Sequence, residues 1–265
     1  MKIYYVIGNP IEHSLSPKIH NYWFKEYGIE ANYEKQSLLD NQLEDFVKKI
    51  KNKKIYGANV TVPFKEKIIP FMDKLTYEAR EANSVNTVYL SENTVVGHNT
   101  DIFGFYFSIK STNINFKNKN ALILGSGGVT PSIIIGLKKL GLEKIIISNR
   151  TKDKAIKLKK RFNFLEVLDW GKTKKANIII NSTSLGLKEK DNINLDQNFF
   201  DSDSFFYDVI YRPKETNFLK NARNKGFLVQ NGLMMFIYQA AEAFKTWHSI
   251  QPKIDKNLID FMQND

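Results

Sequence analysis

Short apolar runs rich in isoleucine and valine alternate with amphipathic segments along almost the whole chain, and this alternation limits the possible folds more than any other feature. A strand that is followed by a helix and then by another strand builds a parallel sheet that helices cover. The alternation therefore predicts an α/β protein. The expected strands lie at residues 2–8, 32–38, 55–62, 85–90, 93–99, 121–124, 143–151, 176–186, 205–211 and 227–232.

A polar stretch at residues 110–120, KSTNINFKNKN, has the composition of a linker and separates two such blocks. We therefore expect two α/β domains with a cleft between them. The apolar segment at residues 232–248 predicts a long final helix, which we expect to return to the first block. The predicted domains are then residues 1–105 with 236–265, and residues 106–235.

A glycine-rich turn follows the strand at residues 121–124 and precedes an apolar helix that Thr130 and Pro131 can begin. Glycines let the backbone approach a pyrophosphate closely, and the helix N-terminus offers free N–H groups and the positive end of its dipole. This context indicates a Rossmann-like domain that binds a dinucleotide. The residues of the turn are Gly125, Ser126, Gly127, Gly128 and Val129.

The next strand ends in Asn149, Arg150 and Thr151, at the distance where such domains contact the adenosine ribose. A site selective for NAD usually carries aspartate or glutamate there, which binds the ribose hydroxyls. Arginine suits a 2′-phosphate instead, because its planar guanidinium is always charged and can bind phosphate through two N–H groups. The segment favours NADP over NAD, and an arginine at a solvated strand end is the alternative interpretation.

Composition excludes several classes of protein. The chain has no cysteine, which excludes disulfides, thiol catalysis and cysteine-ligated metals, and its four histidines lack metal-binding spacing, so we expect no metal. The net charge of +11 would suit nucleic acid, but the lysines are spread over helices and loops without interleaved aromatic residues, so we expect no such partner. Neither a transmembrane run nor a signal peptide is evident, which predicts a cytoplasmic protein without a membrane partner.

Uncharged polar side chains, one lysine and one aspartate gather where strands of the first block end or its helices begin. Such a set suits a polyhydroxylated substrate that bears a carboxylate. Some of these residues also suit a purely structural role: Ser16 can cap the helix that Pro17 begins, and Asp101 can cap the helix after it. The residues are Ser14, Ser16, Asn59, Thr61, Lys65, Asn86, Asn99, Thr100 and Asp101.

The stretch GANVTVPFKEK, residues 57–67, raises the question of whether Lys65 is an ordinary surface lysine. Val60 and Val62 have the spacing of buried strand residues. Pro63 is expected to end the strand, because it lacks an N–H group and has a fixed φ angle. Lys65 would then lie just beyond the carboxyl end of a strand, where ligands bind in α/β sheets.

Nine segments of the chain, in order from residue 8 to residue 244, resemble the successive motifs of the shikimate dehydrogenase family. The resemblance implies an N-terminal substrate-binding domain, a Rossmann-like NADP-binding domain and a cleft between them. It also implies the reversible NADPH-dependent reduction of 3-dehydroshikimate to shikimate, a step of aromatic amino acid biosynthesis. The segments are GNPIEHSLSPKIHN, GANVTVPFKE, NSVNTV, GHNTD, GSGGV, SNRT, NSTSLG, YDVIYRPKET and NGLMMFIYQAAEAF.

The resemblance also implies a role for individual residues. Lys65 would be the catalytic acid–base group, and Asp101 would hold its ammonium in place. On the cofactor side, the glycine turn at residues 125–129 would hold the pyrophosphate, residues 149–151 the 2′-phosphate, and Val209 and Gly232 would line the nicotinamide. The implied substrate-binding residues are Ser14, Ser16, Thr61, Lys65, Asn86, Asp101, Tyr211 and Gln239.

The chain departs from the family pattern in places, and alternatives stay open. His98 stands where the family often has aspartate, and we expect it on the surface of a hairpin. One alternative is an enzyme of broader specificity that also oxidises quinate, with NAD as a possible cofactor. Another is a catalytically silent NADP-binding protein, against which the presence of Lys65 and Asp101 argues. We expect a small-molecule substrate and either a monomer or a homodimer.

Overall fold

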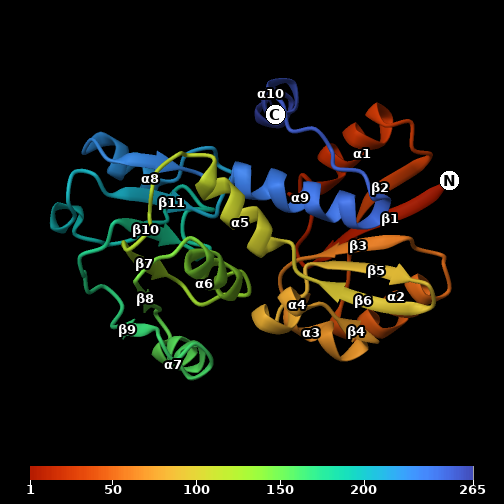
Figure 1. The fold of residues 1–265 in the computed structure, drawn as a ribbon, viewed down its shortest axis with the longest axis horizontal. Coiled ribbons are helices and arrows are strands. Elements are labelled where there is room, and N and C mark those ends of the chain that lie inside the picture. The colour runs from red at the N-terminus through yellow and green to blue at the C-terminus, as the bar shows by residue number, and fades with distance from the viewer. Residues whose placement is uncertain (265) are drawn as a thin grey trace. The chain divides into compact units, whose positions relative to one another are not determined.

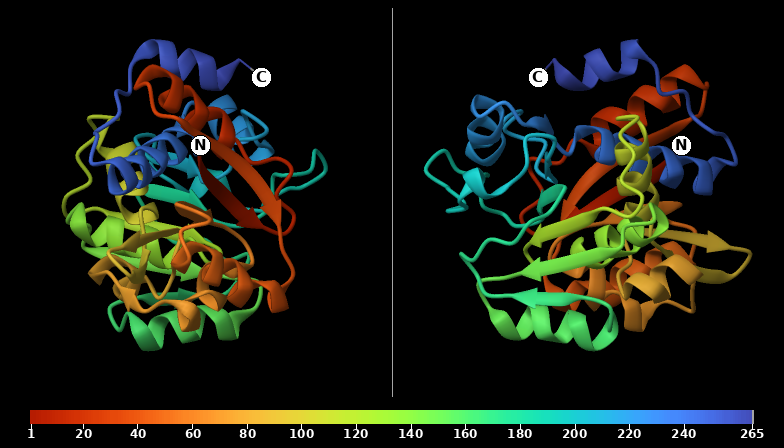
Figure 2. Two further views of the ribbon diagram at one scale, coloured as in Figure 1. Left: turned by 90° about the vertical axis from the view of Figure 1, so that its right-hand side faces the viewer. Right: turned by 60° about the vertical axis from the view of Figure 1, so that its left-hand side comes forward.

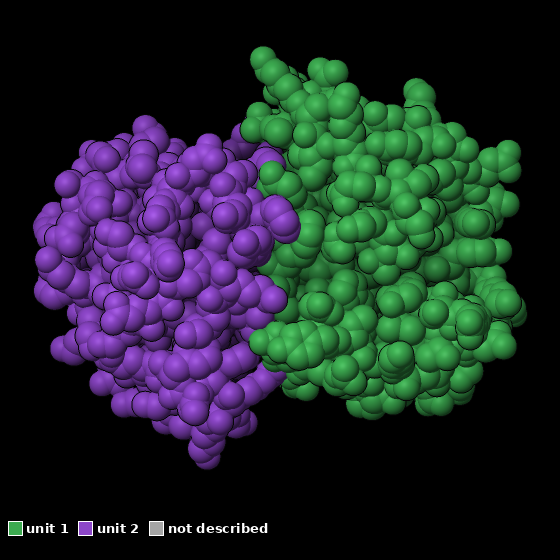
Figure 3. All heavy atoms as spheres, in the orientation of Figure 1, with its two compact units in different colours: residues 1–104, 237–265 green, residues 105–236 purple. Residues whose placement is uncertain are grey.

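The computed structural model describes residues 1–264. The chain forms two compact units, which comprise residues 1–104 with 237–265 and residues 105–236 (Figures 1 and 3). Each unit contains a six-stranded sheet of its own. The sequence-based domain boundaries lie one residue away from these divisions.

The first unit is built on a mixed sheet with the strand order β2-β1-β3-β5-β6-β4. Strand β1 pairs in parallel with β2 and β3, whereas β5 forms an antiparallel hairpin with β6. Its strands are β1 (Lys2–Gly8), β2 (Ala31–Ser37), β3 (Gly57–Val60), β4 (Lys74–Leu75), β5 (Thr87–Ser91) and β6 (Thr94–His98).

Helices of the first unit cover this sheet and connect its strands. Along α2 the apolar residues recur at helical spacing, and they form the buried face of that helix. Two longer helices, α5 (Asp101–Lys110) and α9 (Leu233–His248), carry the chain between the units. The other helices are α1 (Ser16–Glu26), η1 (Asp40–Gln42), α2 (Leu43–Lys51), α3 (Phe64–Lys67), η2 (Ile69–Phe71), α4 (Tyr77–Ala82) and α10 (Lys256–Gln263).

Helix α10, which the sequence patterns did not predict, lies beside α1 (Figures 1 and 2). The ring centroids of Phe261 and Tyr22 are 5.1 Å apart. The Lys18 ammonium lies 4.5 Å from the centroid of the Phe261 ring. These aromatic and cation–π contacts join the C-terminal helix to the first unit.

The second unit contains a fully parallel sheet with the order β12-β11-β10-β7-β8-β9. Its central strands are continuous buried isoleucine runs, as expected of a parallel sheet covered on both faces. The strand order reverses between β7 and β10, which is where such sheets bind ligands. The strands are β7 (Asn120–Leu124), β8 (Lys144–Ser148), β9 (Glu166–Leu168), β10 (Ile178–Asn181), β11 (Phe205–Asp208) and β12 (Leu228–Gln230), and the helices are α6 (Thr130–Lys139), α7 (Lys152–Arg161), η3 (Gln197–Phe199) and α8 (Asn217–Asn224).

The strand expected at residues 55–62 is shorter than predicted. Strand β3 ends at Val60, and the side chain of Val62 is exposed, so the expectation of a buried Val62 was wrong. The reason is a turn, in which the N–H of Phe64 donates to the carbonyl of Thr61 at 2.9 Å. Pro63 therefore lies in this turn, at the N-cap position before helix α3, rather than directly at the end of the strand.

A buried histidine makes the stability of the first unit sensitive to acid. His20 on α1 is fully buried and stacks on Tyr33, with ring centroids 4.4 Å apart. Burial lowers the pKa of His20 to about 3, and burial likewise lowers the pKa of His248 to about 4. The unfolded chain therefore binds protons more readily than the folded chain, so stability is complete above the ordinary histidine pKa and falls as the pH drops below it.

We expect the free energy of unfolding to fall by about 2 kcal/mol between pH 7 and pH 5 through His20 alone, since one pKa unit corresponds to about 1.4 kcal/mol. Urea denaturation at both pH values measures this loss. A His20→Phe variant, which keeps a ring against Tyr33, should lose this part of the pH dependence. The exposed His13 offers the control, and a His13→Gln variant that flattened the dependence equally would contradict the assignment.

No helix within residues 1–264 combines the length and the apolar character that crossing a membrane requires.

Candidate active site

Lys65 and Asp101, which are distant in sequence, form an ion pair in the first unit. The Lys65 Nζ atom lies 2.5 Å from Asp101 Oδ2, and the two side chains are only 12% and 7% exposed. Burial of this kind removes much of the solvent screening that weakens a surface pair. The arrangement holds a proton-donating ammonium in one place beside a carboxylate.

Two local features of the backbone place Lys65. The turn after β3 puts Lys65 in the short helix α3, just past the carboxyl end of that strand. The carbonyl of Lys65 accepts a hydrogen bond from the N–H of Val85 at 2.8 Å. This bond joins α3 to the segment that leads into Asn86.

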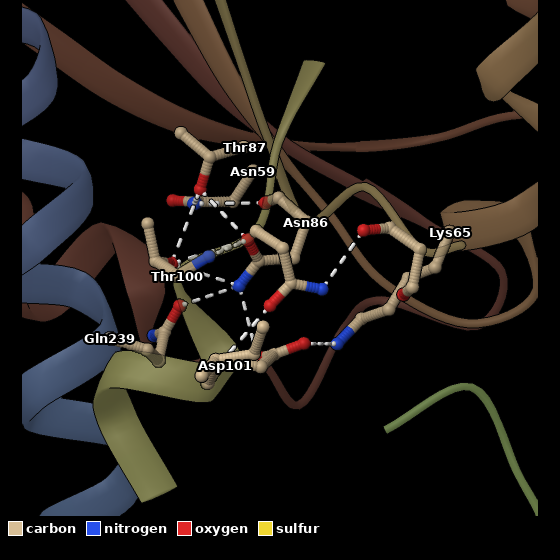
Figure 4. A network of polar contacts seen from close by, with 10 residues as sticks. Asn59, Lys65, Asn86, Thr87, Thr100, Asp101 and Gln239 are labelled. Carbon is tan, nitrogen blue, oxygen red and sulfur yellow. Dashed lines mark hydrogen bonds and ion pairs between the residues drawn. The ribbon is translucent and has the colours of Figure 1, made fainter. Parts of the chain in front are cut away.

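Asp101 is the first residue of α5, and another residue caps that helix. The Oδ1 atom of Asn99 accepts a hydrogen bond from the N–H of Ile102 at 3.2 Å. Asn99, two residues before the start of α5, therefore accepts a free N–H of the first turn, a capping role that the sequence also allowed for Asp101. The Asp101 carboxylate points at Lys65 instead (Figure 4).

Asn86 connects the ion pair to the rest of the polar network (Figure 4). Its Nδ2 atom donates to Asp101 Oδ1 and to Thr100 Oγ1, each at 2.9 Å, and approaches Gln239 Oε1 at 3.4 Å. Its Oδ1 atom accepts from the Thr100 N–H at 2.7 Å. Four of the residues implied by the resemblance, Lys65, Asn86, Asp101 and Gln239, are thus joined in one network.

A second layer of buried polar residues supports Asn86. Asn59 Nδ2 donates to the Asn86 carbonyl and to Thr87 Oγ1, each at 3.1 Å. The Tyr33 hydroxyl donates to Asn59 Oδ1 at 2.6 Å. The sequence patterns did not identify Tyr33 or Thr87, because each lies within a strand, where tyrosine and threonine are common residues.

Ser14 and Thr61 lie on two neighbouring loops of the first unit, and Ser16 begins helix α1 at the end of the first loop. These loops follow β1 and β3, which pair in parallel, so both lie at the carboxyl edge of the sheet. Ser14 Oγ donates to Ser16 Oγ at 3.2 Å and accepts from the Ser16 N–H at 3.3 Å. The expectation that Ser16 caps the helix was wrong, because α1 begins at Ser16 and Leu15 holds the cap position without a side-chain bond.

His98 is not a surface residue of the hairpin, and that expectation was wrong. Its side chain is 14% exposed. Its Nδ1 atom lies 2.8 Å from the Oγ1 atom of Thr76, and Thr76 is the residue that caps α4. Burial lowers the pKa of His98, while the nearby Glu78 opposes this shift.

The glycine turn of the second unit follows β7, at the point where the strand order reverses. Gly125 has a φ angle of +113°, and a Cβ atom there would lie 2.7 Å from Ser182 Oγ. Only glycine tolerates this backbone conformation and this close approach. Helix α6, of 10 residues, begins at Thr130 directly after the turn, and the Ser126 hydroxyl is buried without a hydrogen-bond partner among the described residues. These features fit a pyrophosphate.

Asn149, Arg150 and Thr151 follow β8, the strand next to β7. The N–H of Gly125 donates to the carbonyl of Ser148 at 2.8 Å, which joins the glycine turn to the end of β8. Asn149 Nδ2 donates to the Thr151 carbonyl at 2.8 Å and orders the loop. Arg150 is exposed, so its guanidinium is accessible to a ligand.

Val209 and Gly232, which the resemblance placed beside the nicotinamide, contact each other in the second unit. A Cβ atom on Gly232 would lie 2.1 Å from the Val209 carbonyl oxygen, so this approach requires glycine. The Gly232 N–H donates to the Ile210 carbonyl at 3.1 Å. Tyr211 lies on the same loop, where its ring packs against Phe236 at a centroid distance of 4.9 Å.

Comparison with known proteins points to one family of enzymes. Residues 6–88 match the family described as shikimate dehydrogenase substrate binding domain, and residues 108–195 match shikimate / quinate 5-dehydrogenase. Shikimate dehydrogenase (NADP(+)) from Pelagibacter ubique is 55% identical over 261 residues, which cover 98% of each chain.

Solved structures are similar along the full length. The shikimate dehydrogenase of Aquifex aeolicus superposes with a TM-score of 0.90 at 36% identity and covers 100% of this chain and 98% of its own. Shikimate 5-dehydrogenase from Thermus thermophilus, in complex with NADP(H) and shikimate, gives a TM-score of 0.90 at 32% identity and covers 99% of both chains.

Proposed function

The chain belongs to the shikimate dehydrogenase family, and on that premise we propose that Lys65 and Asp101 are its acid–base pair. The enzyme is an NADP-dependent oxidoreductase that interconverts 3-dehydroshikimate and shikimate. The observation that carries the proposal is the buried contact of 2.5 Å between the Lys65 ammonium and the Asp101 carboxylate.

In the direction of reduction, a ketone oxygen of the substrate gains negative charge and must receive a proton. The Lys65 ammonium can stabilise this oxygen and donate the proton, as a positioned general acid does. Asp101 Oδ2 accepts a hydrogen bond from the same ammonium, and Asn86 holds the other carboxylate oxygen. The carboxylate therefore keeps Nζ in one orientation while a neutral amide fixes the carboxylate.

The remaining polar groups suit the rest of the substrate. Ser14 and Ser16 present hydroxyls at the carboxyl edge of the first sheet and are proposed to bind the substrate carboxylate. Thr61, Asn86 and Gln239 are proposed to bind hydroxyls of the ring. Tyr211 is proposed as a further substrate contact, as the family resemblance implies.

The second unit is proposed to bind NADP through three loops of its parallel sheet. The turn at residues 125–129 would hold the pyrophosphate, and Asn149, Arg150 and Thr151 would hold the 2′-phosphate. Val209 and Gly232 would line the nicotinamide, which supplies or accepts the hydride when the cofactor is bound. Gly232 approaches the Val209 carbonyl closely, and this contact supports the proposal that the two residues form one fixed wall of the nicotinamide site.

Reduction of NADP⁺ by the purified chain tests this function directly. We expect reduction with shikimate and none without substrate, and less with quinate or with NAD⁺. Failure to reduce NADP⁺ with shikimate would contradict the proposal. Faster turnover with quinate would support the enzyme of broader specificity instead. A cytoplasmic location and a monomeric or homodimeric state remain predictions.

A further inference from the structure

Asp208, at the end of β11, is a buried carboxylate that the proposed chemistry does not use. The residue is fully buried, and burial raises the pKa of Asp208 to about 6. Burying a carboxylate in an apolar interior is unfavourable unless hydrogen bonds compensate for the lost water. The hydrogen-bond donors to Asp208 therefore identify the segments that its carboxylate joins.

Four hydrogen bonds from uncharged donors converge on the Asp208 carboxylate. Asn181 Nδ2 lies 3.1 and 3.0 Å from its two oxygens. The Ile210 N–H donates at 2.9 Å, and the Thr216 hydroxyl donates at 2.7 Å. These donors come from the end of β10, the loop after β11 and the N-terminus of α8, where Thr216 is the cap.

Asn181 extends the same arrangement to the neighbouring loop. Its Oδ1 atom accepts from the Thr183 N–H at 3.0 Å and from the Thr183 hydroxyl at 2.7 Å. Its Nδ2 atom also donates to the Leu185 carbonyl at 2.9 Å, and its backbone carbonyl accepts from the Val209 N–H at 3.0 Å. One amide and one carboxylate thus fix both loops at the carboxyl ends of β10 and β11.

The loop after β11 carries Val209 and Tyr211. Both backbone groups of Ile210, which lies between them, form hydrogen bonds. Its N–H donates to Asp208, and its carbonyl accepts from the Gly232 N–H at 3.1 Å. Movement of the Asp208 carboxylate would therefore be transmitted to the Val209 carbonyl and to the position of Tyr211.

We propose that Asp208 is a positioning residue for hydride transfer, which holds the Val209–Tyr211 loop in the conformation that aligns the nicotinamide. The inference rests on the proposed function, because it takes Val209 and Gly232 as the nicotinamide wall. Asp208 itself does not touch the reacting atoms. Its effect is on the geometry of the reaction rather than on the affinity for the phosphates of the cofactor.

An Asp208→Asn variant tests this role with almost no change in volume. The amide replaces one acceptor with a donor, so at least one of the converging donors loses its partner or meets another donor. We expect kcat to fall roughly tenfold, since small misplacements of reacting groups cost rate. The dissociation constants of NADP⁺ and of 2′,5′-ADP should change by less than about threefold, in keeping with a loss of alignment and not of binding.

The primary isotope effect on kcat distinguishes a positioning role from a purely structural one, which would leave it unchanged. It is measured with NADPH deuterated at the transferred position. It should rise in Asp208→Asn, because hydride transfer becomes slower relative to the other steps. The exchanged variant Asn181→Asp with Asp208→Asn restores one amide and one carboxylate and should recover part of the lost kcat, a non-additive result.

Thr216 provides a second test that does not remove the carboxylate. Thr216→Val removes one donor and should shift kcat and the isotope effect in the same direction as Asp208→Asn, whereas Thr216→Ser should behave as the parent chain. If Asp208→Asn does not fold, the Thr216 pair decides the question. Parent-like turnover and isotope effect in Thr216→Val would then overturn the proposal.

Lys65→Ala, assayed in parallel, separates this inference from the proposed function. Parent-like turnover in Lys65→Ala would contradict the acid–base role proposed for Lys65. Low turnover in Lys65→Ala together with parent-like turnover in Asp208→Asn would overturn only the role of Asp208. An Asp208→Asn variant that loses kcat and affinity for 2′,5′-ADP together, with an unchanged isotope effect, would also overturn it, because the second unit would then be disrupted as a whole.

Discussion

Replacing Lys65 with alanine is expected to lower kcat by about 10²–10⁴-fold, the scale that a positioned acid–base group contributes. The variant removes the ammonium that lies 2.5 Å from Asp101 and leaves the carboxylate with its hydrogen bond from Asn86. We expect the chain to remain folded with a lower free energy of unfolding, because truncating one partner of a buried ion pair costs about 3–5 kcal/mol. Steady-state kinetics and urea denaturation measure the two effects separately.

Lys67 provides a matched control on the same short helix. It also forms an ion pair, with Asp40 at 2.6 Å, but the two side chains are 47% and 64% exposed. Surface pairs of this kind contribute about 0–1 kcal/mol. Lys67→Ala should therefore keep both the parent turnover and nearly the parent stability. A Lys65→Ala enzyme with turnover within tenfold of Lys67→Ala would contradict the acid–base assignment.

The elements that sequence could predict are those with a local signal. The isoleucine runs of β8 and β10, the glycine turn after β7 and the buried face of α2 each depend on residues close together in the chain. Gly125 was recognisable because a glycine turn that directly joins a strand to a helix is typical of dinucleotide-binding sheets. The same local signals correctly placed Lys65 after the end of a strand, but they predicted that this strand would continue to Val62, whereas β3 ends at Val60.

Contacts between distant residues account for the features that sequence could not predict. Lys65 and Asp101 are 36 positions apart, and only the collinear motifs suggested that they act together. Asparagine and aspartate can both cap a helix, so the sequence left the choice open. Asn99 makes the capping hydrogen bond of α5, because the Asp101 carboxylate pairs with Lys65. Asp208 and Asn181 are 27 positions apart, and neither stands out within its strand.

Replacing Arg150 with alanine is expected to weaken selectivity for NADPH over NADH by about 10- to 100-fold, mainly through a higher KM for NADPH. Hydrogen bonds to a charged group contribute about 1.5–3 kcal/mol, and about 1.4 kcal/mol corresponds to a tenfold change in affinity. Arg150 follows β8 beside the glycine turn and is exposed, so its guanidinium can reach a phosphate on the ribose without displacing a buried partner. The ratio of kcat/KM for the two cofactors measures the change.

A control variant that loses one positive charge elsewhere distinguishes a specific contact of Arg150 with the 2′-phosphate from general attraction by a basic surface. Lys160 is exposed in the last turn of α7, the helix that begins just after Arg150, and Lys160→Ala removes the same charge farther from the proposed phosphate site. General attraction falls off over about 10 Å at ordinary salt, so Lys160→Ala should leave the cofactor ratio unchanged. Inhibition by 2′,5′-ADP should weaken in Arg150→Ala while inhibition by 5′-AMP should not. Equal weakening of both nucleotides would show that Arg150 does not read the 2′-phosphate, and the preference for NADP would then have to arise from Asn149, Thr151 or the glycine turn.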